Sequence, residues 1–217
     1  MKSTKLFLAT LLIAASFQLT SCNQVEASTE ELVDTSSLVE STAMEVGSFI
    51  TNPDSVISSD IDGLMLMREE EKMAHDVYVY FYDQYQYRIF DNISKSESRH
   101  TESVLNLITY FVYSDPATGI YGQFNNVDIQ AIFNELTTEA TTLEQALATG
   151  AYIEEYDIAD LKTEISKTEN ADIIKVYTNL KRASGYHLKA FVKTLAMQGV
   201  TYKPQILSQE EYDILVQ

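Results

Sequence analysis

The sequence predicts an all-α protein, namely a four-helix antiparallel bundle with a long crossover between the second and third long helices. Four segments of more than about twenty residues place apolar side chains at helical spacing. The connections between them are short, long and short in that order, which suits such a bundle. The chain has only 7 Gly and 3 Pro, far fewer than the tight turns of a β-sandwich or barrel would need.

The first two helices should be joined by a short link. The first is expected over residues 60–86, and the second should follow a break at Asp91 and Asn92. The second helix should end near Tyr113, because Pro116 supplies no N–H and disfavours helix in the residue before it. A connection of nearly thirty residues with a short amphipathic piece then leads to the third helix.

Helix-capping patterns predict where the remaining helices begin. Thr141 and Thr142 both start capping boxes, so the third helix should begin at one of them and continue to about residue 166. Thr168 or Asn170 should cap the fourth, which ends at Gly199. A short C-terminal helix is expected after residue 208.

Charge and cysteine content exclude several classes of function. Among 217 residues, 32 are acidic and 15 basic, for a net charge of −17, so binding to a phosphate backbone is not expected. Cys22 is the one cysteine of the sequence, which excludes an intramolecular disulfide and metal sites built on several thiolates. Any metal must therefore be held by carboxylates and imidazoles.

The N-terminus predicts export to a bacterial cell envelope. Lys2 and Lys5 precede a largely apolar run over residues 6–17, which has the length of a signal-peptide core and not of a membrane span. Residues 19–22 (LTSC) resemble the lipobox of lipoproteins, in which Cys22 carries the lipid anchor. A soluble secreted protein with a cysteine near its cleavage site is the alternative. Residues 1–21 are thus expected to be the signal peptide, residues 22–59 a disordered acidic tether rich in Ser and Thr, and residues 60–217 the folded domain.

Several polar residues fall on the predicted inner stripes of the first two helices. Glu71 lies on the apolar stripe of the first helix and His75 lies near it, whereas Glu69 and Glu70 are expected to be solvated. On the second helix, the Glu97-x-x-His100 spacing is the one from which di-metal sites in bundles are built. The alternative is that Glu97 completes a capping box with Ser94.

The third and fourth helices repeat this pattern. Glu154 and Asp157 face inward on the third helix, with Glu155 toward the edge, and Ser184 and His187 face inward on the fourth. Buried carboxylates and imidazoles cost free energy without a common partner. Their presence on all four helices therefore predicts a shared metal centre.

Four segments resemble an uncharacterised bacterial and archaeal ferritin-like domain family within the ferritin and rubrerythrin superfamily. They are residues 68–78 (REEEKMAHDVY), 92–100 (NISKSESRH), 150–161 (GAYIEEYDIADL) and 187–191 (HLKAF). The resemblance implies a ferritin-like domain with a di-iron or mixed di-metal site, in which manganese could replace iron. It implies the metal ligands Glu71, Glu97, His100, Glu154 and His187, with Tyr78 hydrogen-bonded to a ligand carboxylate.

The sequence departs from the family pattern at Ser184, which stands where the fourth helix should carry a carboxylate. Asp157, Glu155 and His75 are the possible substitutes. Two functions compete: an envelope-anchored metalloprotein that reacts iron with oxygen or peroxide, and a non-enzymatic surface lipoprotein with a degenerate metal site. The first would need an external electron donor, and a homodimer is possible. Membrane contact is expected through the lipid anchor only.

Overall fold

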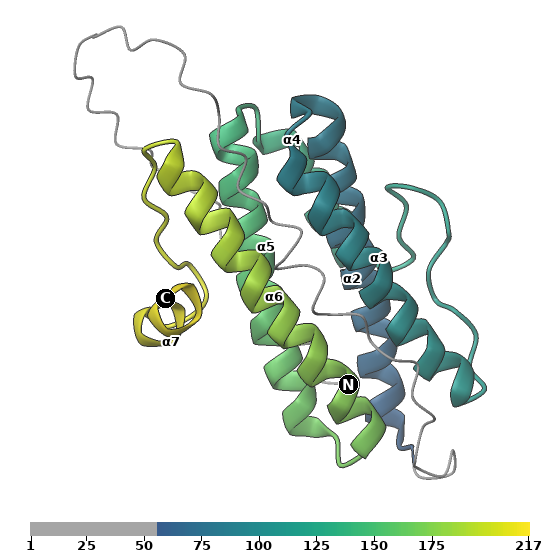
Figure 1. The fold of residues 1–217 in the computed structure, drawn as a ribbon. Helices are drawn as coiled ribbons and strands as arrows, with labels where there is room; N and C mark the ends of the chain where they lie inside the picture. The colour runs from purple at the N-terminus through teal and green to yellow at the C-terminus, as the bar shows by residue number, and fades with distance from the viewer. Residues whose placement is uncertain (1–55) are drawn as a thin grey trace, which may run out of the picture. The chain divides into compact units, whose positions relative to one another are not determined.

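The computed structural model describes residues 56–217, which form six α-helices and no β-strand. The all-helical prediction is therefore confirmed for this part of the chain (Figure 1). None of these helices combines the length and apolar character needed to cross a membrane. The predicted signal peptide, Cys22 and most of the tether lie outside the described residues. The helices are α2 (Ser58–Tyr85), α3 (Arg88–Tyr110), α4 (Val127–Glu139), α5 (Leu143–Lys167), α6 (Ala171–Met197) and α7 (Gln209–Val216).

The four long helices pack as two pairs, α2 with α3 and α5 with α6, and further contacts join α2 to α5 and α3 to α6 (Figure 1). The Tyr85 hydroxyl, at the end of α2, donates to the Ala140 carbonyl just before α5 at 2.9 Å. At the other end of α2, Gly63 lies against Glu164 near the end of α5. Because these contacts join opposite ends, α2 and α5 run antiparallel. The arrangement is compatible with the predicted four-helix bundle.

The link between α2 and α3 lies earlier in the chain than predicted. Gln86 has a left-handed backbone (φ 50°) that ends α2, and Tyr87 is the N-cap of α3. The expected break at Asp91 and Asn92 is therefore wrong, since both residues lie inside α3. Asp91 is compatible with helix because it lies in the first turn, where a negative charge is favourable, and pairs with Lys95 at 2.7 Å.

The other helix starts follow the capping patterns. Thr142 rather than Thr141 caps α5, and it forms the capping box with Gln145. Asn170 rather than Thr168 caps α6, because its side chain accepts the first free backbone N–H groups of that helix. Ser208 caps α7 and Gly199 follows the end of α6 with a positive φ of 77°. These local signals are therefore reliable guides to the helix boundaries.

The long crossover between α3 and α5 covers part of α2 and helps to bury the acidic residues Glu69 and Glu70, which were expected to be solvated. The Glu69 carboxylate accepts backbone N–H groups of Asn125 and Asn126, both at 2.7 Å. Glu70 faces α5, where the Tyr156 hydroxyl lies 3.5 Å from its Oε1. Glu69 and Glu70 are only 3% and 4% exposed, so the expectation that they are solvated is wrong.

Candidate metal centre

Polar side chains interrupt the apolar core at one level of all four long helices. On α2, Met67 belongs to one apolar cluster and Ala74 to the other, and Glu71 lies between them. The corresponding inward polar residues are buried on every helix, at most 9% exposed. They are Glu71 on α2, Glu97 and His100 on α3, Glu154 and Asp157 on α5, and Ser184 and His187 on α6. This level of the helices is the candidate site.

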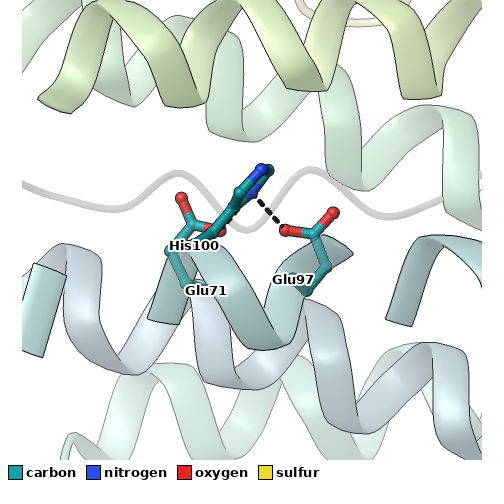
Figure 2. A group of neighbouring side chains, drawn as sticks. All are labelled: Glu71, Glu97 and His100. Atoms are coloured by element: carbon teal, nitrogen blue, oxygen red, sulfur yellow. Dashed lines mark ion pairs between the residues drawn. The ribbon is translucent and has the colours of Figure 1, made fainter. Parts of the chain in front are cut away.

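Glu97 is the shared member of two groups of three residues. Its Oε2 lies 2.7 Å from His100 Nδ1, and its Oε1 lies 2.8 Å from His187 Nδ1. His100 Nδ1 also lies 3.3 Å from Glu71 Oε2, and His187 Nδ1 lies 3.4 Å from Glu154 Oε2. Within each group, ligand atoms lie within 4.8 Å of one another. Figure 2 shows the first group, with Glu71 and Glu97 on either side of His100.

The structure thus brings together the five residues expected as metal ligands, which we call the five-residue cluster: Glu71, Glu97, His100, Glu154 and His187. The alternative capping function of Glu97 does not hold. Ser94 lies inside α3, where its hydroxyl donates to the Asp91 carbonyl, and Glu97 points into the cluster. Whether the cluster holds a metal stays a prediction.

The three residues considered as substitutes for Ser184 have different positions. Asp157 lies beside the cluster, and its carboxylate accepts a hydrogen bond from the Ser184 hydroxyl at 2.5 Å. His75 is half-buried and faces Asp76 at 2.8 Å. Glu155 is buried on another side of α5, where it accepts hydrogen bonds from the Tyr202 hydroxyl and from backbone N–H groups of residues 205–207. Only Asp157 remains beside the other six inward polar residues.

Tyr78 supports one carboxylate of the cluster from α2. Its hydroxyl donates to Glu154 Oε1 at 2.5 Å, which is the kind of contact expected from the sequence. The ring is fully buried and packs on Phe90 and Phe191, with ring centroids 6.5 and 5.4 Å away. Because its ring is held by this packing, the hydrogen bond fixes the orientation of Glu154.

Burial and nearby charges raise the pKa of some groups of the cluster and lower the pKa of others. Burial opposes ionisation of Glu97, but the charges of His100 and His187 outweigh it and lower the pKa. Burial raises the pKa of Glu71 to about 8, although His100 opposes this effect. Burial would lower the pKa of His187, but Glu154 and Glu97 raise it to about 9. The metal-free cluster therefore holds protons on its imidazoles at neutral pH.

Four atoms of the cluster lack hydrogen-bond partners in the described part of the chain, although they are fully buried: Glu71 Oε1, Glu97 Oε1, His100 Nδ1 and His187 Nδ1. His100 Nδ1, His187 Nδ1 and Glu97 Oε1 lie instead in the close imidazole and carboxylate pairs described above. A cation between these atoms would satisfy them together, since buried polar atoms otherwise carry a desolvation cost. The residues thus fit a metal ion held by oxygen and nitrogen ligands.

Glu70 and Asp160 form an acidic contact that the sequence analysis missed. Burial, then the charge of Asp160, raises the pKa of Glu70 well above its ordinary value. Glu70 precedes Glu71 on α2, and Asp160 follows Asp157 by one turn of α5. The i, i+3 spacing of Asp157 and Asp160 was the available signal, because it places both on one side of α5.

Other proteins are similar to this part of the chain. The model of an uncharacterized protein domain, DUF2202, matches residues 60–217. The uncharacterized protein MJ0754 of Methanocaldococcus jannaschii is 41% identical over 157 residues, which cover 71% of this chain and 85% of that protein. The crystal structure of hypothetical protein MJ0754 from Methanococcus jannaschii is similar with a TM-score of 0.75 and 38% identity, over 78% of this chain and 97% of that chain.

Proposed function

The chain belongs to the DUF2202 family, and from its buried cluster we propose that it is a ferritin-like protein that binds two iron ions and reacts them with oxygen or peroxide. The observation that carries the proposal is the sharing of Glu97 between two buried groups of carboxylates and imidazoles, four atoms of which lack hydrogen-bond partners within residues 56–217. Iron bound there would supply the redox chemistry, and the protein would supply the ligands and exclude water.

Each residue of the cluster has a defined role in this proposal. Glu71 and His100 would hold one ion, Glu154 and His187 would hold the other, and Glu97, which belongs to both groups, would serve the two ions. Manganese suits the same donors, so it is the second candidate metal. The sequence has no second cysteine with which to build a thiolate iron site, so electrons would come from an external donor.

The sequence also supports a location for this activity at a bacterial cell envelope. In the proposal, residues 1–21 are removed on export and Cys22 carries a lipid, so that the tether holds the folded domain near a membrane. The native protein should then partition with membranes and a Cys22→Ser variant should not. Equal partitioning of the two forms would exclude the lipid anchor and leave the metal site unaffected.

Metal titration tests the proposed centre. Chelator-treated protein should bind two Fe²⁺ per chain under anaerobic conditions, measured by equilibrium dialysis and elemental analysis. Glu97→Gln should lose both ions because it removes the shared carboxylate, whereas His75→Gln should bind as the native protein does, since His75 lies outside the cluster. Circular dichroism should show that each variant keeps its helices.

Two outcomes would contradict the proposal. One is a native protein that binds no ion, and the other is a Glu97→Gln variant that binds iron as tightly as the native protein. In the first case, the non-enzymatic lipoprotein becomes the better interpretation. Ser184 favours that alternative, because it supplies a hydroxyl where a carboxylate would be expected.

A further inference from the structure

The outer face of α6 carries a row of positive charge. Four basic residues, three of them exposed and one half-buried, share this face with an exposed tyrosine and an exposed methionine. With 3.6 residues per helical turn, all six lie within about 40° of one line along the helix. They are Lys175, Arg182, Tyr186, Lys189, Lys193 and Met197. We call the four basic residues the basic stripe; the side of α6 that carries Ser184 and His187 is opposite to it.

The charges of the basic stripe are not neutralised by acidic neighbours. Residues 173–209 contain six Lys or Arg and no Asp or Glu. Among residues 56–217, none of the four stripe residues forms an ion pair, and Arg182 donates only to the uncharged side chain of Asn179, at 3.2 Å. On α5, by contrast, Lys162 and Lys167 each pair with a carboxylate, at 2.6 and 2.5 Å. The stripe is therefore a local positive surface.

The rest of the chain makes this surface selective for its orientation. Residues 100–161, which include α4 and most of α5, contain ten Asp or Glu and no Lys or Arg. An anionic partner is thus attracted at the basic stripe and repelled by this acidic segment. The net charge of −17 does not prevent contact at the stripe, because salt screens exposed charges beyond about 8–10 Å.

The shape of the stripe suits an extended anionic surface. From Lys175 to Lys193 it follows a straight helix for 18 residues, or about 27 Å at 1.5 Å per residue. Lysine contributes a compact charge on a flexible stem, and here these charges are spread along the helix instead of meeting at one point. A layer of lipid phosphate groups can contact all four charges, and clusters of four or more Lys or Arg are typical of binding to anionic lipids.

The proposed lipid anchor brings the domain to such a surface without choosing which face meets it. The 35 residues between Cys22 and Ser58 could span at most about 120 Å, so the lipid alone leaves the orientation open. The first turns of α2 lie beside the first turns of α6, since a methyl group on Gly63 would lie 3.5 Å from the Tyr177 hydroxyl. The chain from the anchor therefore enters the domain near Lys175, where the basic stripe begins.

We propose that the basic stripe binds the anionic headgroups of the membrane to which the tether is attached, so that α6 lies along the membrane and His187 faces away from it. This inference rests on the envelope location in the proposed function. It adds a second membrane contact to the lipid anchor, through which alone the sequence predicted contact. A second copy of the chain is a poorer partner, because a basic stripe on another copy's acidic face is a heterologous contact that would repeat into an open chain.

Vesicle sedimentation tests the proposal with the mature chain, residues 22–217, carrying Cys22→Ser so that no lipid contributes. It should bind vesicles of phosphatidylethanolamine and phosphatidylglycerol at least roughly tenfold more tightly than uncharged phosphatidylcholine vesicles, and added salt should weaken this binding. Replacing the stripe should remove at least roughly tenfold of the affinity for the anionic vesicles. The stripe variant combines Lys175→Gln, Arg182→Gln, Lys189→Gln and Lys193→Gln.

A matched control removes the same amount of charge from other helices and should bind as the unchanged stripe does. It combines Arg88→Gln, Lys95→Gln, Arg99→Gln and Lys162→Gln. Circular dichroism should show native helical content in both variants, and Lys193→Gln alone, which should weaken binding severalfold, decides the question where four changes prevent folding.

Three results would overturn the proposal. One is equal binding to anionic and uncharged vesicles, and another is an equal loss of binding in the stripe variant and the control. The third is self-association without vesicles that the stripe variant alone abolishes, which would assign the stripe to a second copy. Because the assay uses no metal and no lipid anchor, each of these results would leave the proposed metal site and the Cys22 anchor to their own tests.

Discussion

Raising the pH from 6.5 to 9 should destabilise the metal-free protein. Burial would lower the pKa of His187, but the carboxylates of Glu154 and Glu97 outweigh burial and raise the pKa to about 9. The folded chain therefore keeps a proton that the unfolded chain loses near pH 6.5. This contribution to the free energy of unfolding is complete below pH 6.5 and is lost as the pH rises through about 9.

The size of the loss follows from the two pKa values. A rise from 6.5 to about 9 corresponds to about 3 kcal/mol in favour of the protonated folded state. Glu71 acts in the same direction, because burial raises its pKa to about 8 and the folded chain again holds the additional proton. The two groups together should make the metal-free protein clearly less stable at pH 9.

Urea denaturation in the presence of a chelator measures this loss at the two pH values. The native protein should lose about 3 kcal/mol or more, His187→Gln should lose less, and His75→Gln should behave like the native protein. Bound metal should remove the effect, because a metal-bound imidazole is already deprotonated. A metal-free protein that is equally stable or more stable at pH 9 would refute the reasoning.

Three further predictions concern the cluster and the core around it. Metal binding should release protons, so affinity should rise up to roughly tenfold per pH unit for each proton released between pH 6.5 and 9, as measured by calorimetry in several buffers. Tyr78→Phe should weaken metal binding roughly 10-fold to 100-fold and lower stability by about 1–3 kcal/mol, because Glu154 loses its hydrogen bond. Gly150→Ala should destabilise the protein by about 1–3 kcal/mol, because the new methyl group would lie 2.5 Å from the buried Phe191 ring. Gly63→Ala, where the methyl group would meet the end of the Glu164 side chain and, at 3.5 Å, the Tyr177 hydroxyl, should be less destabilising in the same denaturation assay.

Each of these predictions has a contrary result. Metal affinity that does not change with pH would mean that the imidazoles hold no protons in the metal-free protein. A Tyr78→Phe variant that binds metal as the native protein does would show that the hydrogen bond does not orient Glu154. A Gly150→Ala variant as stable as Gly63→Ala would show that the Phe191 ring can move aside at little cost.

The fold was largely predictable because it depends on local patterns. Helical spacing of apolar residues locates the long helices, and side chains such as Thr142 and Asn170 mark helix starts through hydrogen bonds to residues two or three positions away. The break at Asp91 and Asn92 was mispredicted for the same local reason. Both residue types are common in turns, and nothing nearby indicates that Gln86 ends the preceding helix instead.

Burial of single charged residues was not predictable, because it depends on distant segments. Glu69 is covered by backbone N–H groups of Asn125 and Asn126, more than fifty residues away in the sequence. Glu155 is likewise enclosed by backbone N–H groups of residues 205–207. Every residue except proline carries a backbone N–H, so the residue types do not show which segment will cover a run of charged residues. Such a run is therefore expected to be solvated from the sequence alone.

The site was predictable as far as helical faces determine it. The inner stripes identified all members of the five-residue cluster, because a stripe states which residues point inward. The stripes did not show which of Asp157, Glu155 and His75 lies beside Ser184, because that depends on the relative position of α5 and α6 along their axes. The hydrogen bond between Ser184 and Asp157 shows which of the three residues lies beside Ser184.

The five-residue cluster costs the metal-free protein stability. Each buried charge loses hydration, and attraction between buried charges often fails to compensate, so apolar side chains of similar size would stabilise such a core equally well or better. Here the carboxylates outnumber the imidazoles, and four buried atoms of the cluster lack hydrogen-bond partners among residues 56–217. A divalent cation would reverse this balance, because it would replace the protons that the metal-free cluster holds and would contact these atoms together. Metal should therefore stabilise the folded chain most at high pH, where the imidazoles have lost their protons and the carboxylates repel one another most strongly.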